Sequence, residues 1–281
     1  MNYLVTGNQG FIGKELVQYL GKETLKTNTK LGNNIYLSNP YNLINDLDFA
    51  FEKNNISGIF HLGAYSRIYL SDKNINDVLK YNINGLNIVL QYATKHTIPV
   101  VFTSTSYNFV NPYANAYAVS KLIGEELCKY YRKTHGTKVY VVRLSNVYGN
   151  LREDYPEYKL GVVDLFLKKW KHKEDYTINN SGNQTRDYIH VNDVCSNLLR
   201  IMLSGKDIDW DKNEYIPICS EQVYSVKDIC SMIFDYPPTA LKSISGEIES
   251  CPIKNTLNLP IKQNLKEYIQ FVKDGILRKI L

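Results

Sequence analysis

The hydrophobic positions of the first 144 residues form two alternating patterns: short runs of apolar and β-branched residues, and longer segments of helical period. The short runs predict strands at residues 2–5, 35–37, 58–62, 100–103 and 138–144. The longer segments predict helices at residues 11–19, 43–52, 76–95 and 117–132. Strands that alternate with helices in this way are best joined by right-handed crossovers onto one parallel sheet. The pattern therefore predicts an α/β fold with a doubly wound sheet.

The pattern changes after Asn150, where a polar stretch precedes a predicted helix at residues 162–170 and a strand at 176–178. A further helix at 192–202 and a strand at 214–218 could return to the first sheet. No stretch rich in Gly, Ser or Pro separates these parts, so a flexible linker is not expected. We therefore expect two interleaved regions. Residues 1–145 and about 187–220 form the larger one, and residues 146–186 and 221–281 form a smaller α+β region.

Composition places the chain among ordinary globular proteins. It has 281 residues, 44% hydrophobic and 22% charged, and a net charge of +5 that suits a small anion as well as a polyanion. Its amino end has no features of a signal peptide and no run approaches a membrane span, so we expect a cytoplasmic protein without membrane contact. The five scattered cysteines predict free thiols in a reducing compartment and no metal site; they are Cys128, Cys195, Cys219, Cys230 and Cys251.

A glycine-rich turn joins the first strand to the first helix. It places Gly7, Gly10 and Gly13 where a tight turn, a close backbone approach and close helix–strand packing each require a missing Cβ. The N–H groups and positive end of the helix would then face a pyrophosphate. The sequence therefore predicts a dinucleotide site that also includes Gln9, Phe11 and Ile12. The alternative is a tight turn that binds nothing.

The choice of dinucleotide stays open at this point. An acidic residue that would hold the adenosine ribose is expected about 20 residues after the turn, but no Asp or Glu occurs between Glu23 and Asp46. Lys26 and Lys30 lie nearby and could accept a 2′-phosphate, or could simply be surface lysines. NAD and NADP both fit.

Tyr117 and Lys121 lie four residues apart on one face of a predicted helix. A free tyrosine has a pKa near 10, but a nearby ammonium and a cationic nicotinamide would favour the phenolate and allow acid/base chemistry. The pair follows a strand that ends in a cluster of hydroxyl side chains at residues 103–106. Doubly wound sheets bind their ligands at this edge, the carboxyl end of the strands.

These motifs together resemble the extended short-chain dehydrogenases/reductases of the nucleotide-sugar epimerase/dehydratase family, over nearly the whole chain. The matching segments are residues 6–13, 61–64, 82–85, 104–105, Tyr117 with Lys121, 143–149 and 182–193. The resemblance implies a Rossmann domain in the larger region and a nucleotide-sugar-binding domain in the smaller one. It makes Thr105 the hydroxyl that bonds the reacting sugar oxygen, Tyr117 the acid/base and Lys121 its ribose-binding partner.

The same resemblance implies further site residues. Leu62, Gly63, Ala64 and Asn82 would line the cofactor, Ser106 would contact substrate, and Asn146 and Arg186 would hold the nucleotide diphosphate. An arginine fork suits phosphate oxygens because it can donate two parallel hydrogen bonds. From the residues alone, Arg186 could instead pair with Asp187, and Asn146 could be a turn residue.

The residues after Thr105 narrow the reaction. The 4,6-dehydratases of the family carry Asp-Glu there and the decarboxylases carry Glu two positions on, whereas this chain has Ser106 and Tyr107. What remains is a UDP-sugar C4 epimerase, which we favour, or a 4-keto nucleotide-sugar reductase. Two other hypotheses are a non-catalytic dinucleotide-sensing regulator and a reductase of lipophilic alcohols, and the intact catalytic set and the diphosphate residues argue against them.

The expected partners are a nucleotide-diphosphate sugar and a second copy of the chain, with no nucleic acid. By resemblance, the helices at 76–95 and 117–132 would form a homodimer interface. Their apolar residues could instead all pack against the sheet of the same chain. The sugar pocket would be drawn from loops at residues 65–71, 107–113 and 154–160, whose side chains do not reveal the stereochemistry of the sugar.

Overall fold

The computed structural model describes residues 1–27, 35–37, 43–66, 68–151, 155, 157, 160–210, 212–242 and 253–280. Lys30 and Cys251 lie outside these residues, as do the side chain of Lys26 and most of the loop at 154–160. The chain divides into two compact units: Met1–Arg143 with Cys195–Ile216, and Leu144–Val194 with Pro217–Leu281. Each unit is described by itself. The functional roles assigned to the two regions above remain predictions.

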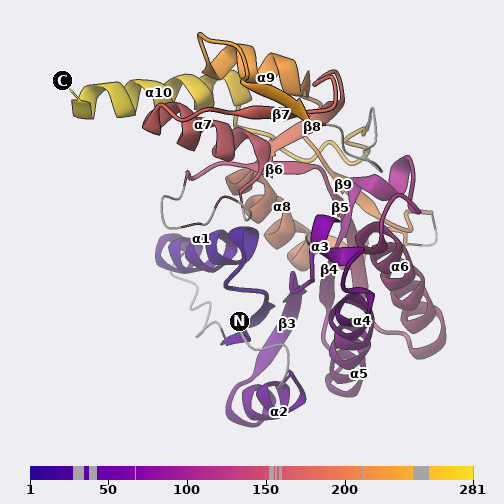
Figure 1. Ribbon diagram of the computed structural model, residues 1–281. Helices are drawn as coiled ribbons and strands as arrows, with labels where there is room; N and C mark the ends of the chain where they lie inside the picture. Colours follow the sequence, from indigo (N-terminus) through magenta and orange to yellow (C-terminus); the bar gives the residue numbers. More distant parts are fainter. Residues whose placement is uncertain are drawn as a thin grey trace. The chain divides into compact units, whose positions relative to one another are not determined.

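The first unit contains the predicted parallel sheet (Figure 1). Its strand order is β2-β1-β3-β4-β5-β9, and β1 pairs in parallel with β2 and β3, as does β3 with β4. The strands are β1 (Asn2–Thr6), β2 (Ile35–Leu37), β3 (Ile56–His61), β4 (Val100–Thr105), β5 (Val139–Leu144) and β9 (Ile216–Ile218). The doubly wound α/β fold is confirmed.

Helices cover both faces of this sheet. The longer ones are α1 (Phe11–Thr27), α2 (Leu43–Lys53), α5 (Gly85–His96), α6 (Ala116–His135) and α8 (Val191–Ser204), and the short ones are α3 (Ile68–Ser71) and α4 (Ile75–Val78). Ile59 of β3 packs in one core cluster with residues of α2, α5 and α6. Successive strand residues point to opposite faces. Accordingly, Gly58 faces Met202 of α8, because a Cβ at Gly58 would lie 2.7 Å from its sulfur.

The predicted single helix at 76–95 is wrong in one respect. The structure divides it into α4, the π-helical segment η2 (Leu79–Asn84) and α5. A wide turn of this kind inside an α-helix commonly marks a site where a side chain is needed elsewhere. Here the amide of Asn82, within η2, bonds to two other segments of the chain.

The second unit is built on small sheets. β8 (Thr185–His190) lies between β6 (Asn146–Tyr148), which is parallel to it, and β10 (Val223–Ser225), which is antiparallel. A second sheet pairs β7 (Thr177–Asn179) with β11 (Ala240–Lys242). The helices are α7 (Val162–His172), α9 (Val226–Ile233) and α10 (Leu265–Ile280). Their core is rich in aromatic rings, among which Tyr176 and Phe234 stack with centroids 3.7 Å apart.

Two further observations concern the cysteines and the lengths of the helices. Four of the five cysteines are described, and Cys128, Cys195, Cys219 and Cys230 are all free thiols, as predicted. Among the described residues, no helix has both the length and the apolar character needed to cross a membrane.

Candidate active site

The glycine-rich turn leaves β1 in a conformation that only glycine adopts easily. Gly7 has φ of +73°, and a Cβ there would lie 2.7 Å from the backbone nitrogen of Gly63. A Cβ at Gly13 would lie 2.8 Å from the Cα of Asn8, closer than real Cβ atoms come. The turn is closed by a 2.9 Å hydrogen bond from the Gly10 nitrogen to the Gly7 oxygen. Gly7 and Gly13 thus lie where a Cβ would not fit, and the close approach of a pyrophosphate to Gly10 stays a prediction.

This turn fits a dinucleotide pyrophosphate. Gln9 and Gly10 lie in the turn, and Phe11, Ile12 and Gly13 form the first turn of α1. The first turn of α1 contains no acidic residue, so the N–H groups and positive helix end meet no competing carboxylate of their own helix. At Gly10 a Cβ would meet only the Gly7 oxygen, at 3.1 Å, among the described residues, so the glycine there leaves the backbone accessible to a bulky anion.

A buried pair of side chains ties this turn to the loop after β3. Thr6 Oγ accepts a hydrogen bond from the Gly63 nitrogen at 3.0 Å and lies 2.8 Å from His61 Nδ1. Thr6 Oγ and His61 Nδ1 share a hydrogen bond whose direction depends on which ring nitrogen of His61 carries the hydrogen. Burial, and secondarily the Lys121 ammonium, lower the pKa of His61 to about 3. The ring therefore stays neutral and holds residues 62–64 beside Gly7.

Asn82 connects the same loop to α6. Its Oδ1 accepts from the Tyr65 nitrogen at 2.6 Å, and its Nδ2 donates to Ser120 Oγ at 2.9 Å. Ser120 in turn donates to the Tyr117 oxygen at 2.7 Å. Asn82 is thus engaged by protein groups on both sides, and its direct contact with a cofactor stays a prediction. Ser120 was not identified from sequence, because its role depends on contact with a residue 38 positions away.

The predicted catalytic residues lie on two elements of the first unit. Thr105 is the last residue of β4, and its hydroxyl accepts from the Tyr107 nitrogen at 3.3 Å. Ser106 follows, buried at the start of the 3₁₀ turn η3 (Ser106–Phe109). Asn115 caps α6 by accepting from the Ala118 nitrogen at 2.8 Å, which places Tyr117 in the first helical turn.

Lys121 is held in a buried position one helical turn after Tyr117. Its Nζ donates to the Thr103 oxygen at 2.8 Å and lies 4.7 Å from the ring centroid of Phe102 and 5.8 Å from that of Tyr117. Burial lowers the pKa of Lys121 to about 8, opposed by Cys128 and Glu125. Burial, with a smaller contribution from Tyr107, raises the pKa of Tyr117 to about 12. In the protein alone, Tyr117 is therefore a neutral hydrogen-bond donor.

The predicted phosphate-binding residues lie in the second unit. Asn146 on β6 is opposite Tyr188 on β8, and Arg186 is two residues before Tyr188. Residues two apart on a strand share a face, so Asn146 and Arg186 share one face of the small sheet. Asp187 points to the other face and accepts a 3.1 Å hydrogen bond from the Ser220 nitrogen. This arrangement favours a role for Arg186 other than pairing with Asp187.

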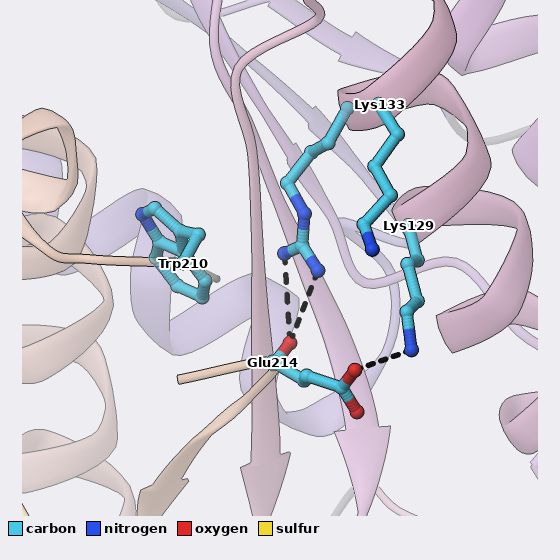
Figure 2. Close-up of a pocket in the computed structure, with 5 residues that line it drawn as sticks. Lys129, Lys133, Trp210 and Glu214 are labelled. Atoms are coloured by element: carbon cyan, nitrogen blue, oxygen red, sulfur yellow. Dashed lines mark hydrogen bonds and ion pairs between the residues drawn. The ribbon is translucent and has the colours of Figure 1, made fainter. Parts of the chain in front are cut away.

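One cavity of the first unit is not lined by any of the predicted site residues. It has a volume of about 360 Å³ and is lined by Lys129, Arg132, Lys133, Trp210 and Glu214 (Figure 2). The helical residues among them belong to the carboxyl-terminal half of α6, whereas Tyr117 lies in its first turn. Lys129 forms an ion pair with Glu214, and Arg132 donates to the Glu214 oxygen at 3.5 Å. Lys129 and Arg132 are thus already bound by Glu214 within the protein.

Comparison with known proteins identifies the family of the chain. The sequence profile of the NAD dependent epimerase/dehydratase family matches residues 3–211. The chain belongs to this family. The resemblance noted from the sequence is therefore confirmed, the protein is an enzyme, and NAD is the cofactor of its family.

Individual members of the epimerase/dehydratase family are similar over most of the chain. A Methanocaldococcus jannaschii protein named "Putative UDP-glucose 4-epimerase" is 29% identical, with 82% of this chain and 80% of the relative covered. A Bacillus subtilis protein named as an uncharacterized UDP-glucose epimerase is 26% identical, with 100% and 97% covered. The UDP-glucose 4-epimerase of Thermotoga maritima, solved with UDP-glucose, superposes with a TM-score of 0.81 at 22% identity over 100% of both chains. This structural similarity establishes the fold.

Proposed function

We propose that this chain is an NAD-dependent UDP-sugar 4-epimerase. The observation that carries the proposal is the buried Lys121, whose ammonium is fixed against the Thr103 oxygen and faces the ring of Tyr117. An ammonium buried at this position has a clear use in an acid/base site, because it favours the phenolate form of the tyrosine. The relatives named as UDP-glucose epimerases support the choice of substrate class.

The cofactor site is assigned to the first unit. The turn at Gly7–Gly13 and the loop at residues 62–64 would hold NAD, with Lys121 toward the nicotinamide ribose and Asn82 shaping the loop. NAD held there would supply the hydride acceptor and donor that inversion at the sugar C4 needs. Its positive charge also acts against the effect of burial, which keeps the pKa of Tyr117 at about 12 in the protein alone.

The protein's own steps are proton transfers and anchoring. Tyr117 removes the proton of the sugar 4-hydroxyl as C4 is oxidised and returns a proton to the oxygen when C4 is reduced. Thr105 holds that oxygen with a hydrogen bond, and Ser106 contacts the sugar. Asn146 and Arg186 anchor the diphosphate, so the 4-keto hexose is free to turn over between the two hydride transfers. The residues that follow Thr105 offer no carboxylate for a dehydratase reaction.

We also propose that the enzyme works as a homodimer through α5 and α6, which lie side by side (Figure 1). Four apolar residues of the helical segment at 76–95 are instead buried in the core: Val78, Leu86, Val89 and Leu90. Leu79, Ile123 and Tyr130 stay exposed by 47%, 40% and 52%. Ile123 and Tyr130 lie seven residues apart on α6 and so share one face of the helix, and exposed apolar side chains on one face suit a protein–protein interface.

The first test is to denature the purified protein, identify any released dinucleotide by mass spectrometry, and assay the protein on a panel of UDP-sugars. We expect retained NAD near one equivalent and interconversion of one C4 epimer pair, abolished in Tyr117→Phe. An empty site with NADPH oxidation by a 4-keto nucleotide sugar would instead identify a reductase. Full turnover by Tyr117→Phe would disprove the assigned mechanism.

A further inference from the structure

A buried carboxylate lies one helical turn after Lys121. Glu125 is 8% exposed and accepts four hydrogen bonds. Its Oε1 accepts from Ser104 Oγ, from Asn108 Nδ2 at 3.0 Å and from Arg143 Nε at 2.9 Å. Its Oε2 accepts from Arg143 Nη2 at 2.6 Å. One carboxylate thus joins β4, η3 and β5 to helix α6.

Arg143, the partner of Glu125, is itself fixed on every side. Its guanidinium lies 3.6 Å from the ring centroid of Tyr215 and 4.7 Å from that of Phe109. Its Nη1 donates to the Asn108 oxygen at 3.3 Å. The two rings meet edge to face at 5.3 Å. Since Arg143 cannot turn away from this position, the carboxylate that it binds through two nitrogens is held in one orientation.

The fixed carboxylate reaches both sides of Thr105. Ser104 comes directly before Thr105, and Asn108 lies three residues after it. Lys121, on the same helix, holds the Thr103 oxygen. The segment that carries Thr105 is therefore bound before and after that residue to α6, the helix that also carries Tyr117.

Stability alone does not explain this arrangement. Removing two charges from water is costly, and a buried ion pair can often be replaced by apolar residues of similar size without loss of stability. Apolar residues, however, could not accept hydrogen bonds from Ser104, Asn108 and Arg143 at once. We propose that Glu125 is a positioning residue, which uses its carboxylate, oriented by Arg143, to fix Thr105 against the helix that presents Tyr117 and Lys121.

This proposal rests on the proposed function, and its main test is kinetic. Glu125→Gln keeps the size of the side chain but cannot accept all of these hydrogen bonds, since its amide nitrogen is a donor. Misplacing a catalytic group by about 1 Å can reduce the rate by roughly 10²-fold. We expect a fall in kcat of that order, a KM for the UDP-sugar within about twofold of the wild-type value, and undiminished NAD retention.

Two variants on the same helix serve as controls. Glu126 is the exposed neighbour of Glu125, so Glu126→Gln removes the same charge without touching the network. Lys129→Ala breaks the surface ion pair with Glu214 (Figure 2) and leaves Arg143 in place. Both should keep the wild-type kcat. A folded Glu125→Gln protein that also keeps the wild-type kcat would overturn the proposal.

A second variant covers the case in which Glu125→Gln does not fold. Ser104→Ala removes one of the four hydrogen bonds and leaves the ion pair intact. It should lower kcat in the same direction without changing KM, and an unchanged kcat in this variant would contradict a positioning role.

Hydrogen–deuterium exchange tests the positioning role of Glu125 without depending on the proposed enzymatic activity. Amide exchange in the peptide that covers residues 104–109 should be faster in Glu125→Gln and Ser104→Ala than in wild type, and unchanged in Glu126→Gln. If the wild-type enzyme epimerises none of the sugars, the proposed function fails, and exchange alone then decides on the positioning role. Exchange that is the same in all four proteins would refute it.

Discussion

Two Gly→Ala substitutions in helix α1 should have opposite effects on stability. At Gly13 the new Cβ would lie 2.8 Å from the Cα of Asn8 and the carbonyl carbon of Gly7, and closer still to the Gly7 oxygen. All these atoms belong to the backbone, so the helix and the turn must move apart. At Gly21, in the same helix, a Cβ would have no heavy atom of the described residues within 4 Å apart from the backbone of its own helix.

The magnitudes follow from these distances. Overpacking of this kind costs about 1–3 kcal/mol, whereas alanine is favoured over glycine inside a helix by about 1 kcal/mol. Alanine also restricts the unfolded chain equally at both positions, so that contribution cancels in the comparison. Gly13 and Gly21 both lie in α1, so the helix preference of alanine cancels as well, and we expect Gly13→Ala to unfold roughly 1–3 kcal/mol more easily than Gly21→Ala, a difference of the order of 2–10 °C in Tm.

Thermal unfolding and urea titration of the two variants and wild type provide the assay, combined with the amount of NAD retained after purification. Gly13→Ala should also lose NAD, because the turn that faces the pyrophosphate is displaced, while Gly21→Ala should retain it. If Gly13→Ala unfolded at the wild-type temperature and kept its NAD, the close contact in this turn and the cofactor site assigned to it would both be wrong.

Two further predictions concern buried titratable groups. Lys121→Met should lose about 10²-fold or more in turnover yet keep or raise Tm at pH 7, because burial lowers the lysine's pKa to about 8 and the ammonium is costly to bury. Burial raises the pKa of Asp164 to about 7, so the folded state binds this proton more tightly than the unfolded chain and loses stability as pH rises from about 4 to 7. Asp164→Asn should therefore come closest to wild type in Tm near pH 4 and exceed it by a growing margin up to pH 8; a Tm difference that stays the same across this range would contradict the assignment.

The first unit could be predicted well because short local patterns in the sequence specify its strands and helices. Each strand of the large sheet is a short apolar run, and the helices between them carry their own period. The glycine turn, Thr105, Tyr117 and Lys121 could be identified for the same reason, since each belongs to a short motif next to a predicted element. The partners that hold them could not. The contacts of Lys121 with Thr103 and of Asn82 with Ser120 join segments that only the fold brings together.

The second unit was predicted less completely because its elements are short and polar. β6 and β10 have three residues each, and β8 carries Arg186 and Asp187 in its first half, so no strand was expected at any of them. Their pairing supplies the stability that their composition lacks. Helix α9 was also missed, although Ser225 and Asp228 form a capping box that is visible in the sequence.

Helix α6 shows how one element can combine catalytic and structural roles. Tyr117, Lys121, Glu125 and Lys129 follow one another at intervals of four residues, and each step turns about 40° further around a helix with 100° per residue. The direction of the side chain therefore changes along this series. Lys121 points to the buried carboxyl end of β4, where it holds the Thr103 oxygen. Lys129 lies at the surface, where its side chain is 30% exposed and pairs with Glu214. Glu125 lies between these ends, still buried but turned toward Arg143. A strict interval of four residues thus gives each side chain a different neighbour, which explains why charges spaced evenly in the sequence differ in burial and in role.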